Sequence, residues 1–514
     1  MESAKAAVSG NCPGRENSRG FMPKEKAVKT ARKTMSSFGF AGRIKEEHVF
    51  LALALLFGVL WVFLIPPFQS PDENEHFMRA WSLSEGKIFL EHAKDENGHF
   101  VTGAYLPVDA AELPDRLDYS LIMRRPFVKL NFGRFRDYVL SQDFKTGSNA
   151  RIFQKVGDGD YAPVNFMPQV VGILAGRALS CSPLGCFYMA RIFSLFFYII
   201  LVFAGLRIMP FGRNMLMTVA LLPMSLGIAA SLNTDVVLNG VMFLFIAYVF
   251  SRAFKKPSEL VNGKEVKIFF AFCVLIALLK PVYTPIVLLL LMLPKERFRD
   301  LKAMVMFIGG CFALTFLVMA AWNITVAHTL ISGDWRQNGL NPKYQFHVAL
   351  THPFRMLGIM FNGYFHYPLA SGGRGLFRQF IGILGWLDVV FPSYLYFLAG
   401  LFLASQVLVS QDGPDMRLWP RALLLTSFAI AVMGISFAMF VEATPTDSAT
   451  LLGTQGRYFT SIAPAALLAV SNTNRKYFNG PVSKTIKSPI FAGLCITGIL
   501  LAATYYIASR YYYL

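Results

Sequence analysis

The chain has 514 residues, of which 54 % are hydrophobic and only 16 % are charged. This composition excludes an ordinary soluble domain, because the apolar residues gather in runs long enough to cross about 30 Å of hydrocarbon. The formal net charge of +18 could indicate a nucleic-acid partner. The lysines and arginines lie instead in short segments between the apolar runs, as in membrane proteins, so we expect the lipid bilayer and no nucleic acid as partner.

Residues 1–48 are mostly polar and basic and show little hydrophobic periodicity. Because of this composition we predict a disordered cytoplasmic tail. We expect no cleavable signal peptide, because no small-residue cleavage site follows the first apolar run. A membrane domain is predicted over residues 49–510. Its clear apolar spans are expected at residues 49–66, 187–206, 214–232, 235–251, 303–326, 391–409, 421–441 and 489–508. Two further runs are residues 268–294, which Lys280-Pro281 divides, and the short run 458–471.

The basic loops decide the expected orientation of these spans. If the apolar run 166–179 crossed the membrane, the basic loops 207–213 and 252–267 would lie outside the cell, against the positive-inside rule. If this run lies along the outer interface, and 268–294 makes two passes, every basic loop faces the cytoplasm. We therefore predict an all-α polytopic bundle of about eleven transmembrane helices with a cytoplasmic N-terminus. Its long first extracytoplasmic loop, residues 67–186, is predicted to contain interfacial helices.

The six cysteines show neither zinc-binding nor redox spacing. Cys181 and Cys186 lie five residues apart in the predicted external loop, where the spacing fits either a disulfide or a packed turn. Arg177 and Arg191 flank the end of the apolar stretch 166–179. Arginines at such a membrane edge act either as anchors or as ligands of a phosphate.

An acidic cluster, Asp72-Glu73-Asn74-Glu75, follows the first span. The preceding serine and proline are typical of a helix start, and capping alone would explain acids in a first turn. Asp72, Glu75 and His76 nevertheless fall three to four residues apart and share one helical face, which Arg79 continues. A carboxylate at this water boundary is suited to accept the proton of a sugar hydroxyl as the hydroxyl attacks.

Two further ionisable residues stand where membrane proteins rarely place them. Asp235 follows Asn233-Thr234 between two spans, where it is either a first-turn acid of a helix or part of a site on the same side as Asp72. Lys280 interrupts a long apolar run, and a lysine at such depth is costly without a partner. That partner is either an acid of a neighbouring helix or the phosphate of a lipid-linked ligand.

Two glycine-containing segments complete the set of candidate site elements. Residues 382–388 end in Asp388, which either caps a helix or contacts a sugar. Residues 453–459 contain glycines that let the backbone approach a ligand closely. Their polar side chains offer donors that suit a pyranose or a phosphate: Gln455, Arg457 and Tyr458.

Together these segments resemble a bacterial family of predicted membrane proteins of unknown function that is placed in the GT-C glycosyltransferase clan. The resemblance covers residues 49–472 in consistent order, and its most specific stretches are GILGWLD and QGRYF. It is carried by residues 66–77, 161–168 with Arg177 and Arg191, 233–235, 382–388 and 455–459.

The resemblance implies a GT-C-like bundle that transfers a sugar from a polyprenyl-phosphate carrier at the outer membrane face, usually with inversion. Residue by residue, it implies Asp72 as the base with Glu73 beside it, and Asp235 as a second external acid. No motif fixes the cation that meets the phosphate, and the candidates are Lys280, Arg79 and Arg457. The resemblance leaves open whether a divalent metal ion is a cofactor, and Glu73 and Glu75 are the candidate ligands for one.

We therefore expect an inverting glycosyltransferase in the bacterial inner (cytoplasmic) membrane, with its active site on the extracytoplasmic side. Its partners would be a polyprenyl-phosphate-linked sugar and a glycan or lipid-linked acceptor of the cell envelope. The remaining candidate side chains, Glu75, His76, Asp388, Gln455 and Tyr458, are expected to bind substrate. Two alternatives are a transporter or flippase of lipid-linked glycans and a non-catalytic envelope assembly protein, for which the acidic turn is only a helix cap.

Overall fold

The computed structural model describes residues 44–513 apart from residues 95–97, 99, 124, 126, 132, 134, 137–149, 255–259, 328–338, 366–374, 410–415 and 472–479. The chain divides into two units, residues 1–44 and residues 45–514, and the second contains all the described helices and strands. The predicted cytoplasmic tail, residues 1–48, lies almost wholly outside the described residues.

The body of the second unit is helical. Among the described residues, six helices are long and apolar enough to cross a membrane: α2 (Glu46–Leu64), α9 (Pro183–Ile208), α12 (Asp235–Phe254), α14 (Leu301–Ala327), α20 (Leu418–Ala443) and α23 (Pro489–Tyr511). Two shorter apolar helices accompany them, the 3₁₀ helix η3 (Pro281–Met292) and α19 (Ser393–Leu408). The helical membrane character predicted from the apolar runs is thus confirmed, whereas the count of about eleven spans stays a prediction.

Shorter helices connect these spans. They are α10 (Arg213–Ala220), α11 (Pro223–Ala229), α13 (Gly263–Leu279), η4 (Lys295–Arg297), α18 (Leu376–Gly382), η6 (Gly456–Phe459), α21 (Ala463–Val470) and α22 (Pro481–Ile486). The run 214–232, predicted as one span, forms two helices, because Pro223 has no amide hydrogen to continue α10 and instead begins α11.

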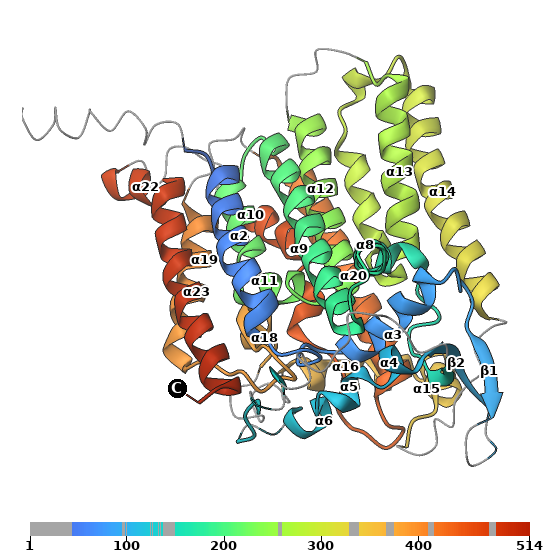
Figure 1. Ribbon diagram of the computed structural model, residues 1–514. Helices are drawn as coiled ribbons and strands as arrows, with labels where there is room; N and C mark the ends of the chain where they lie inside the picture. Colours follow the sequence, from blue (N-terminus) through green and yellow to red (C-terminus); the bar gives the residue numbers. More distant parts are fainter. Residues whose placement is uncertain are drawn as a thin grey trace, which may run out of the picture. The chain divides into compact units, whose positions relative to one another are not determined.

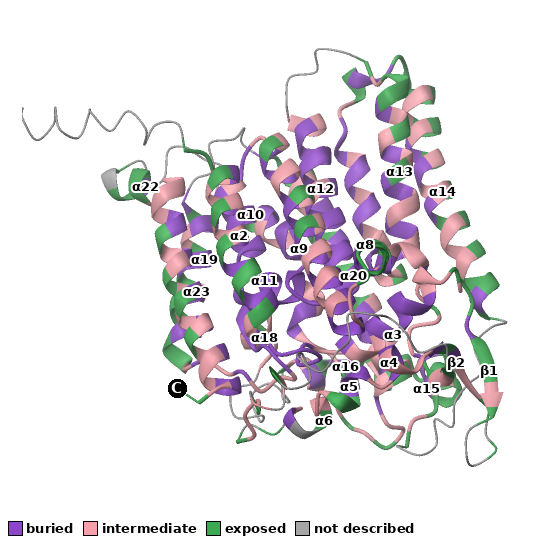
Figure 2. Ribbon diagram, in the orientation of Figure 1, coloured by how far each residue is buried: buried purple, intermediate pink, exposed green. Residues whose placement is uncertain are grey.

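Helix α12 lies at the centre of the body. In its most apolar stretch 83 % of the residues are buried inside the protein, against 17 % in α14, which lies at one side (Figures 1 and 2). Helix α12 packs against α9 and α13, and its first residue, Asp235, lies near the candidate site. The central position of α12 therefore fixes one wall of that site within the most densely buried part of the body.

The described residues of 67–186, which we call the cap, lie mostly at one end of the helices, together with α15 (Pro342–Thr351) and α16 (Pro353–Phe365) (Figure 1). The helices of the cap are α3 (Glu73–Ser84), α4 (Val108–Ala111), α5 (Leu113–Arg116), α6 (Tyr119–Ile122), η2 (Pro163–Phe166) and α8 (Met167–Ala178). An antiparallel sheet was not predicted; its strands, in the order β1-β2-β3, are β1 (Glu91–Lys94), β2 (Phe100–Pro107) and β3 (Arg151–Lys155).

Helix α8 corresponds to the apolar run whose status decided the predicted topology. Its 12 residues extend over about 18 Å, which is shorter than the hydrocarbon layer of a bilayer. It packs along the beginning of α9. Cys181 and Cys186 lie in and just after the turn between the two helices, and both are free thiols, so the packed turn is observed and the disulfide is not.

The contact between α8 and α9 depends on Gly172. A Cβ atom at this position would lie 2.6 Å from Ala190 Cα and 2.7 Å from Met189 O. At Gly309 in α14, by contrast, a Cβ atom would meet nothing within 4 Å. The same substitution is therefore expected to have opposite effects at these two positions.

We expect Gly172→Ala to lower the free energy of unfolding by about 1–3 kcal/mol, because the backbone of α9 must move away. Gly309→Ala should leave it unchanged or raise it by up to about 1 kcal/mol through helix propensity. Thermal unfolding of both variants in one detergent measures the difference. Equal unfolding midpoints would contradict the close packing of α8 on α9.

Candidate functional site

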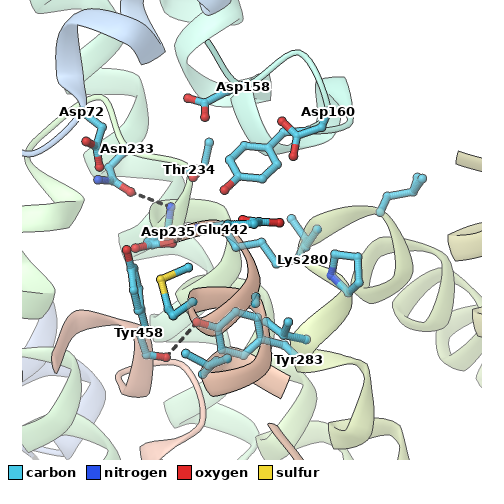
Figure 3. A pocket seen from close by; sticks show the side chains of 18 of the residues that line it. Asp72, Asp158, Asp160, Asn233, Thr234, Asp235, Lys280, Tyr283, Glu442 and Tyr458 are labelled. Atoms are coloured by element: carbon cyan, nitrogen blue, oxygen red, sulfur yellow. Dashed lines mark hydrogen bonds and ion pairs between the residues drawn. The ribbon is translucent and has the colours of Figure 1, made fainter. Parts of the chain in front are cut away.

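A cavity of about 330 Å³ opens between the cap and the ends of the central helices. It is bounded by the start of α3 and the loop after β3, by the ends of α12, α13, α14 and α20, and by η6. Eleven ionisable side chains among the described residues line it: Asp72, His76, Asp158, Asp160, Tyr161, Asp235, Lys280, Tyr283, Glu442, Arg457 and Tyr458. Figure 3 shows Asp72, Asp235, Lys280 and Glu442 around this space.

The first ion pair of the cavity joins Asp72 to Arg457. Arg457 Nη2 donates to Asp72 Oδ2 at 2.6 Å. Asp72 occupies the N-cap position of α3 in a left-handed conformation with φ 61°, which directs it out of the turn rather than onto its own helix. Burial disfavours the charged carboxyl, but Arg457 and His76 outweigh that effect, and the pKa of Asp72 lies below its ordinary value. Asp72 is therefore ionised at neutral pH.

The second ion pair lies deeper. Lys280 Nζ donates to Asp235 Oδ1 at 2.6 Å, and the two side chains are 15 % and 3 % exposed. The ring centroid of Tyr161 lies 5.3 Å from the same ammonium group. Of the two partners considered for Lys280, the acid of a neighbouring helix is thus present, and the pair still lines the cavity.

The third ion pair holds a strap, residues 156–162, over the cavity. His76 Nδ1 lies 2.9 Å from Leu232 O, and His76 Nε2 lies 3.2 Å from Asp158 Oδ2. A carbonyl only accepts, so Nδ1 carries a hydrogen, and a carboxylate at Nε2 favours the doubly protonated ring. Burial opposes this charge, but Asp158 outweighs it and raises the pKa of His76.

Further contacts tie the strap to both sides of the cavity. Gly157 N donates to Glu75 Oε2 at 2.9 Å, and Trp322 Nε1 of α14 donates to Asp160 O at 2.7 Å. Burial raises the pKa of Glu75 and of Asp160, and Asp158 adds to the effect at both. The strap therefore closes one edge of the cavity and is held there mainly by residues of α3.

Arg457 and Arg191 differ in how many of their donors are used. Arg191 is completely buried, and its five N–H groups bond to Glu73 Oε1 and Oε2 and to the carbonyls of Val62, Ile65 and Pro66. Arg457 is only 6 % exposed, yet among the described residues its side chain donates to Asp72 alone, and its Nε has no partner. A buried guanidinium with unused donors at a cavity is suited to bind an anion.

Glu73 organises the site without lining it. Its Oε1 also accepts from Leu232 N at 3.0 Å. One carboxylate therefore joins the turn that carries Asp72 to the loop that precedes Asp235. Since both oxygens of Glu73 are engaged by Arg191, this side chain supports the position of Asp72 rather than contacting a ligand.

The structure places four other predicted site residues outside the cavity lining. Arg79 is buried and donates to the carbonyls of Lys87 and Ile88. Asp388 accepts from Arg510 at 2.6 Å and 2.8 Å. Glu75 holds the strap, and Gln455 precedes η6.

The predicted metal ligands do not fit a metal ion. Glu73 uses both oxygens on Arg191, and Glu75 lies at Gly157. In the part of the chain that the structure describes, no group of three His, Cys, Asp or Glu side chains could hold one.

Sequence reasoning missed the acids of the strap and of α20. Asp158 and Asp160 belong to the stretch Gly157-Asp158-Gly159-Asp160, whose alternation of glycine and aspartate was a usable signal of a tight polar turn. Glu442 carried no such signal, because it stands alone at the end of an apolar span. Only the folded chain brings it to the cavity.

The fold and the cavity define a helical membrane protein with a charged site at one end of its bundle. The family described as predicted membrane protein (DUF2142) matches residues 55–466, and the chain belongs to this family. The match includes every residue that lines the cavity. No curated protein and no solved structure matches the chain.

We expect Glu73→Gln to lower the free energy of unfolding by about 3–5 kcal/mol, because it leaves the buried charge of Arg191 without a counter-ion. Glu91→Gln is the matched control, since Glu91 pairs with Lys87 in water with its side chain 48 % exposed. Its effect should stay within about 1 kcal/mol. Denaturant unfolding in one detergent compares them, and similar losses in both variants would argue against the role given to Glu73.

The His76–Asp158 pair predicts a pH dependence of stability. Because the folded-state pKa of His76 is raised, the stabilisation is complete below the unfolded value of about 6.5 and is lost as the pH rises through the folded value. His76 faces Asp158, Asp72 and Lys280, and the two acids outweigh the lysine. The unfolding midpoint of His76→Gln should thus lie furthest below that of the wild type near pH 6 and approach it at alkaline pH, above the folded-state pKa.

The exposed His347 supplies the control for this measurement. The unfolding midpoint of His347→Gln should differ from that of the wild type by the same small amount at both pH values. A deficit of His76→Gln that grows toward high pH would show that the folded state does not favour the charged ring.

Proposed function

We propose that the protein is an inverting membrane glycosyltransferase that transfers a sugar from a polyprenyl-phosphate-linked donor to a cell-envelope glycan acceptor. The observation that carries the proposal is that the ionised Asp72 and the cations Arg457 and Lys280 line one cavity. A base and a site for a leaving phosphate are the two requirements of this reaction. The resemblance to GT-C glycosyltransferases through the acidic turn after the first span supports the same assignment.

The reaction follows from an exchange of ionic partners. Arg457 pairs with Asp72 through one nitrogen and has further donors for a phosphate oxygen, while Lys280 supplies a second charge at the cavity. When the donor phosphate shares Arg457, the proton affinity of Asp72 increases, because its counter-charge is partly withdrawn. The site thus prepares its base when the donor binds.

In the chemical step an acceptor hydroxyl oxygen attacks the anomeric carbon as the bond from that carbon to the phosphate oxygen breaks. Asp72 accepts the hydroxyl proton, and the polyprenyl phosphate leaves as an anion whose charge Arg457 and Lys280 stabilise. Attack from the face opposite the phosphate inverts the anomeric centre. No covalent intermediate with the protein is required.

The charge distribution supports an extracytoplasmic site in a bacterial inner membrane. Asp235 begins α12 at the cavity, and Arg252 lies near its other end. Helix α12 has 20 residues, which correspond to about 30 Å, the thickness of the hydrocarbon layer. Arg297 donates to Arg252 O. The segments on either side of Arg297 and at the start of α13 carry further cations that we expect on the cytoplasmic side: Lys264, Lys267, Lys295, Arg299 and Lys302.

The proposal predicts that Asp72→Asn lowers sugar transfer at least about a hundredfold, because the amide keeps the shape of the side chain but accepts no proton. Transfer is measured with purified protein in liposomes, with labelled polyprenyl-phosphate sugars and envelope glycan acceptors. Asp447→Asn is the control, since Asp447 is an exposed acid that does not line the cavity. Wild-type turnover by folded Asp72→Asn protein would exclude Asp72 as the base.

A further inference from the structure

Helix α23 lies beyond the residues matched by the family, yet its last turn reaches the segment that carries Asp72. The Tyr512 hydroxyl, just after this turn, donates to Leu64 O at 2.9 Å, and the Tyr511 hydroxyl donates to Gln69 O at 3.5 Å. Leu64 is the last residue of α2, and Gln69 lies within residues 65–72, which we call the link between α2 and α3. The end of α23 and the residue after it therefore contact the chain at the start of the link and within it.

A second connection runs through the segment that ends in Asp388. Arg510 Nε and Nη2 donate to Asp388 Oδ2 at 2.8 Å and 2.6 Å. Two residues before Asp388, Trp386 Nε1 donates to Phe68 O at 3.0 Å. Gly385 makes this arrangement possible, because a Cβ atom there would lie 2.4 Å from the Tyr511 hydroxyl.

The link needs such support because its own conformation is unfavourable. Leu64 ends α2, so its carbonyl has no partner within the helix and accepts from Tyr512 instead. Phe68 has φ 62°, a left-handed conformation that is unfavourable for a residue with a side chain. Without external hydrogen bonds the link would relax toward commoner backbone angles, and the Asp72 carboxylate would lose its direction toward Arg457.

We infer that Tyr512 and Trp386 are positioning residues, which hold the link between α2 and α3 so that Asp72 faces Arg457. Neither side chain lines the cavity. They act on the backbone of Leu64 and Phe68 and leave the phosphate-binding cations untouched. The catalytic consequence rests on the proposed function, whereas the effect on the link does not.

The experiment compares Tyr512→Phe and Trp386→Phe, which remove one donor each, with the controls Tyr505→Phe and Trp419→Phe, whose side chains are each 60 % exposed. Hydrogen–deuterium exchange in detergent reports on the turn through the amide hydrogens of Gln69, Glu73 and His76. Sugar transfer is measured for the same four proteins as kcat and as the donor KM, over a range of pH.

We expect the turn amides to exchange about tenfold faster in both test variants, while the rest of the protein and both controls exchange as the wild type does. The value of kcat should fall about tenfold, and the donor KM should stay within about twofold. The acid limb of the pH profile should move to higher pH, because the pKa of Asp72 rises when Arg457 no longer faces it.

Unchanged turn exchange in the test variants would overturn the inference, and so would faster exchange spread over the whole protein, which indicates a general loss of stability. A wild-type protein without transfer activity would refute the proposed function alone. The exchange measurement would still decide whether Tyr512 and Trp386 position the link.

Discussion

Arg191 and Glu73 form a buried ion pair on which the geometry of the candidate site depends. All five donors of the guanidinium are used, three of them on carbonyls at the end of α2. The carboxylate in turn accepts from Leu232 N. Because a buried charge that loses its partner is strongly destabilising, these bonds hold the turn that carries Asp72 beside the loop that precedes Asp235.

Within that frame the cavity contains ion pairs of a different kind. Asp72 with Arg457, Asp235 with Lys280 and Asp158 with His76 each place an acid beside a cation at a surface open to ligand. Arg191 has a structural role, because all five of its N–H groups are bonded within the protein, whereas Arg457 retains several unused N–H groups. A ligand anion can therefore bind the cations of the cavity without breaking the ion pair of Arg191 and Glu73.

The cap adds a mechanical constraint to this electrostatic one. The strap is tied to α3 through Glu75 and His76, and α3 begins just after Asp72. From the other side, the end of α23 and Trp386 hold the link that precedes Asp72. The acid proposed as base is thus fixed by elements that lie far apart in the sequence, which explains why a side chain that is 46 % exposed keeps a defined direction.

The apolar runs determined the helical membrane character, and the serine-proline-acid sequence after the first run indicated that a helix begins near Asp72, because both depend on local backbone and solvation preferences. The helix begins at Glu73, and the left-handed conformations of Phe68 and Asp72 depend on tertiary contacts instead. The same reasoning selected Asp235, Lys280 and Arg457, which are costly in an apolar chain wherever they fold. It could not foresee that Glu73 and Asp388 bind Arg191 and Arg510, or that Glu442 reaches the cavity. Those partners lie far apart in sequence, and only the packing of α9, α20 and α23 decides which charge meets which.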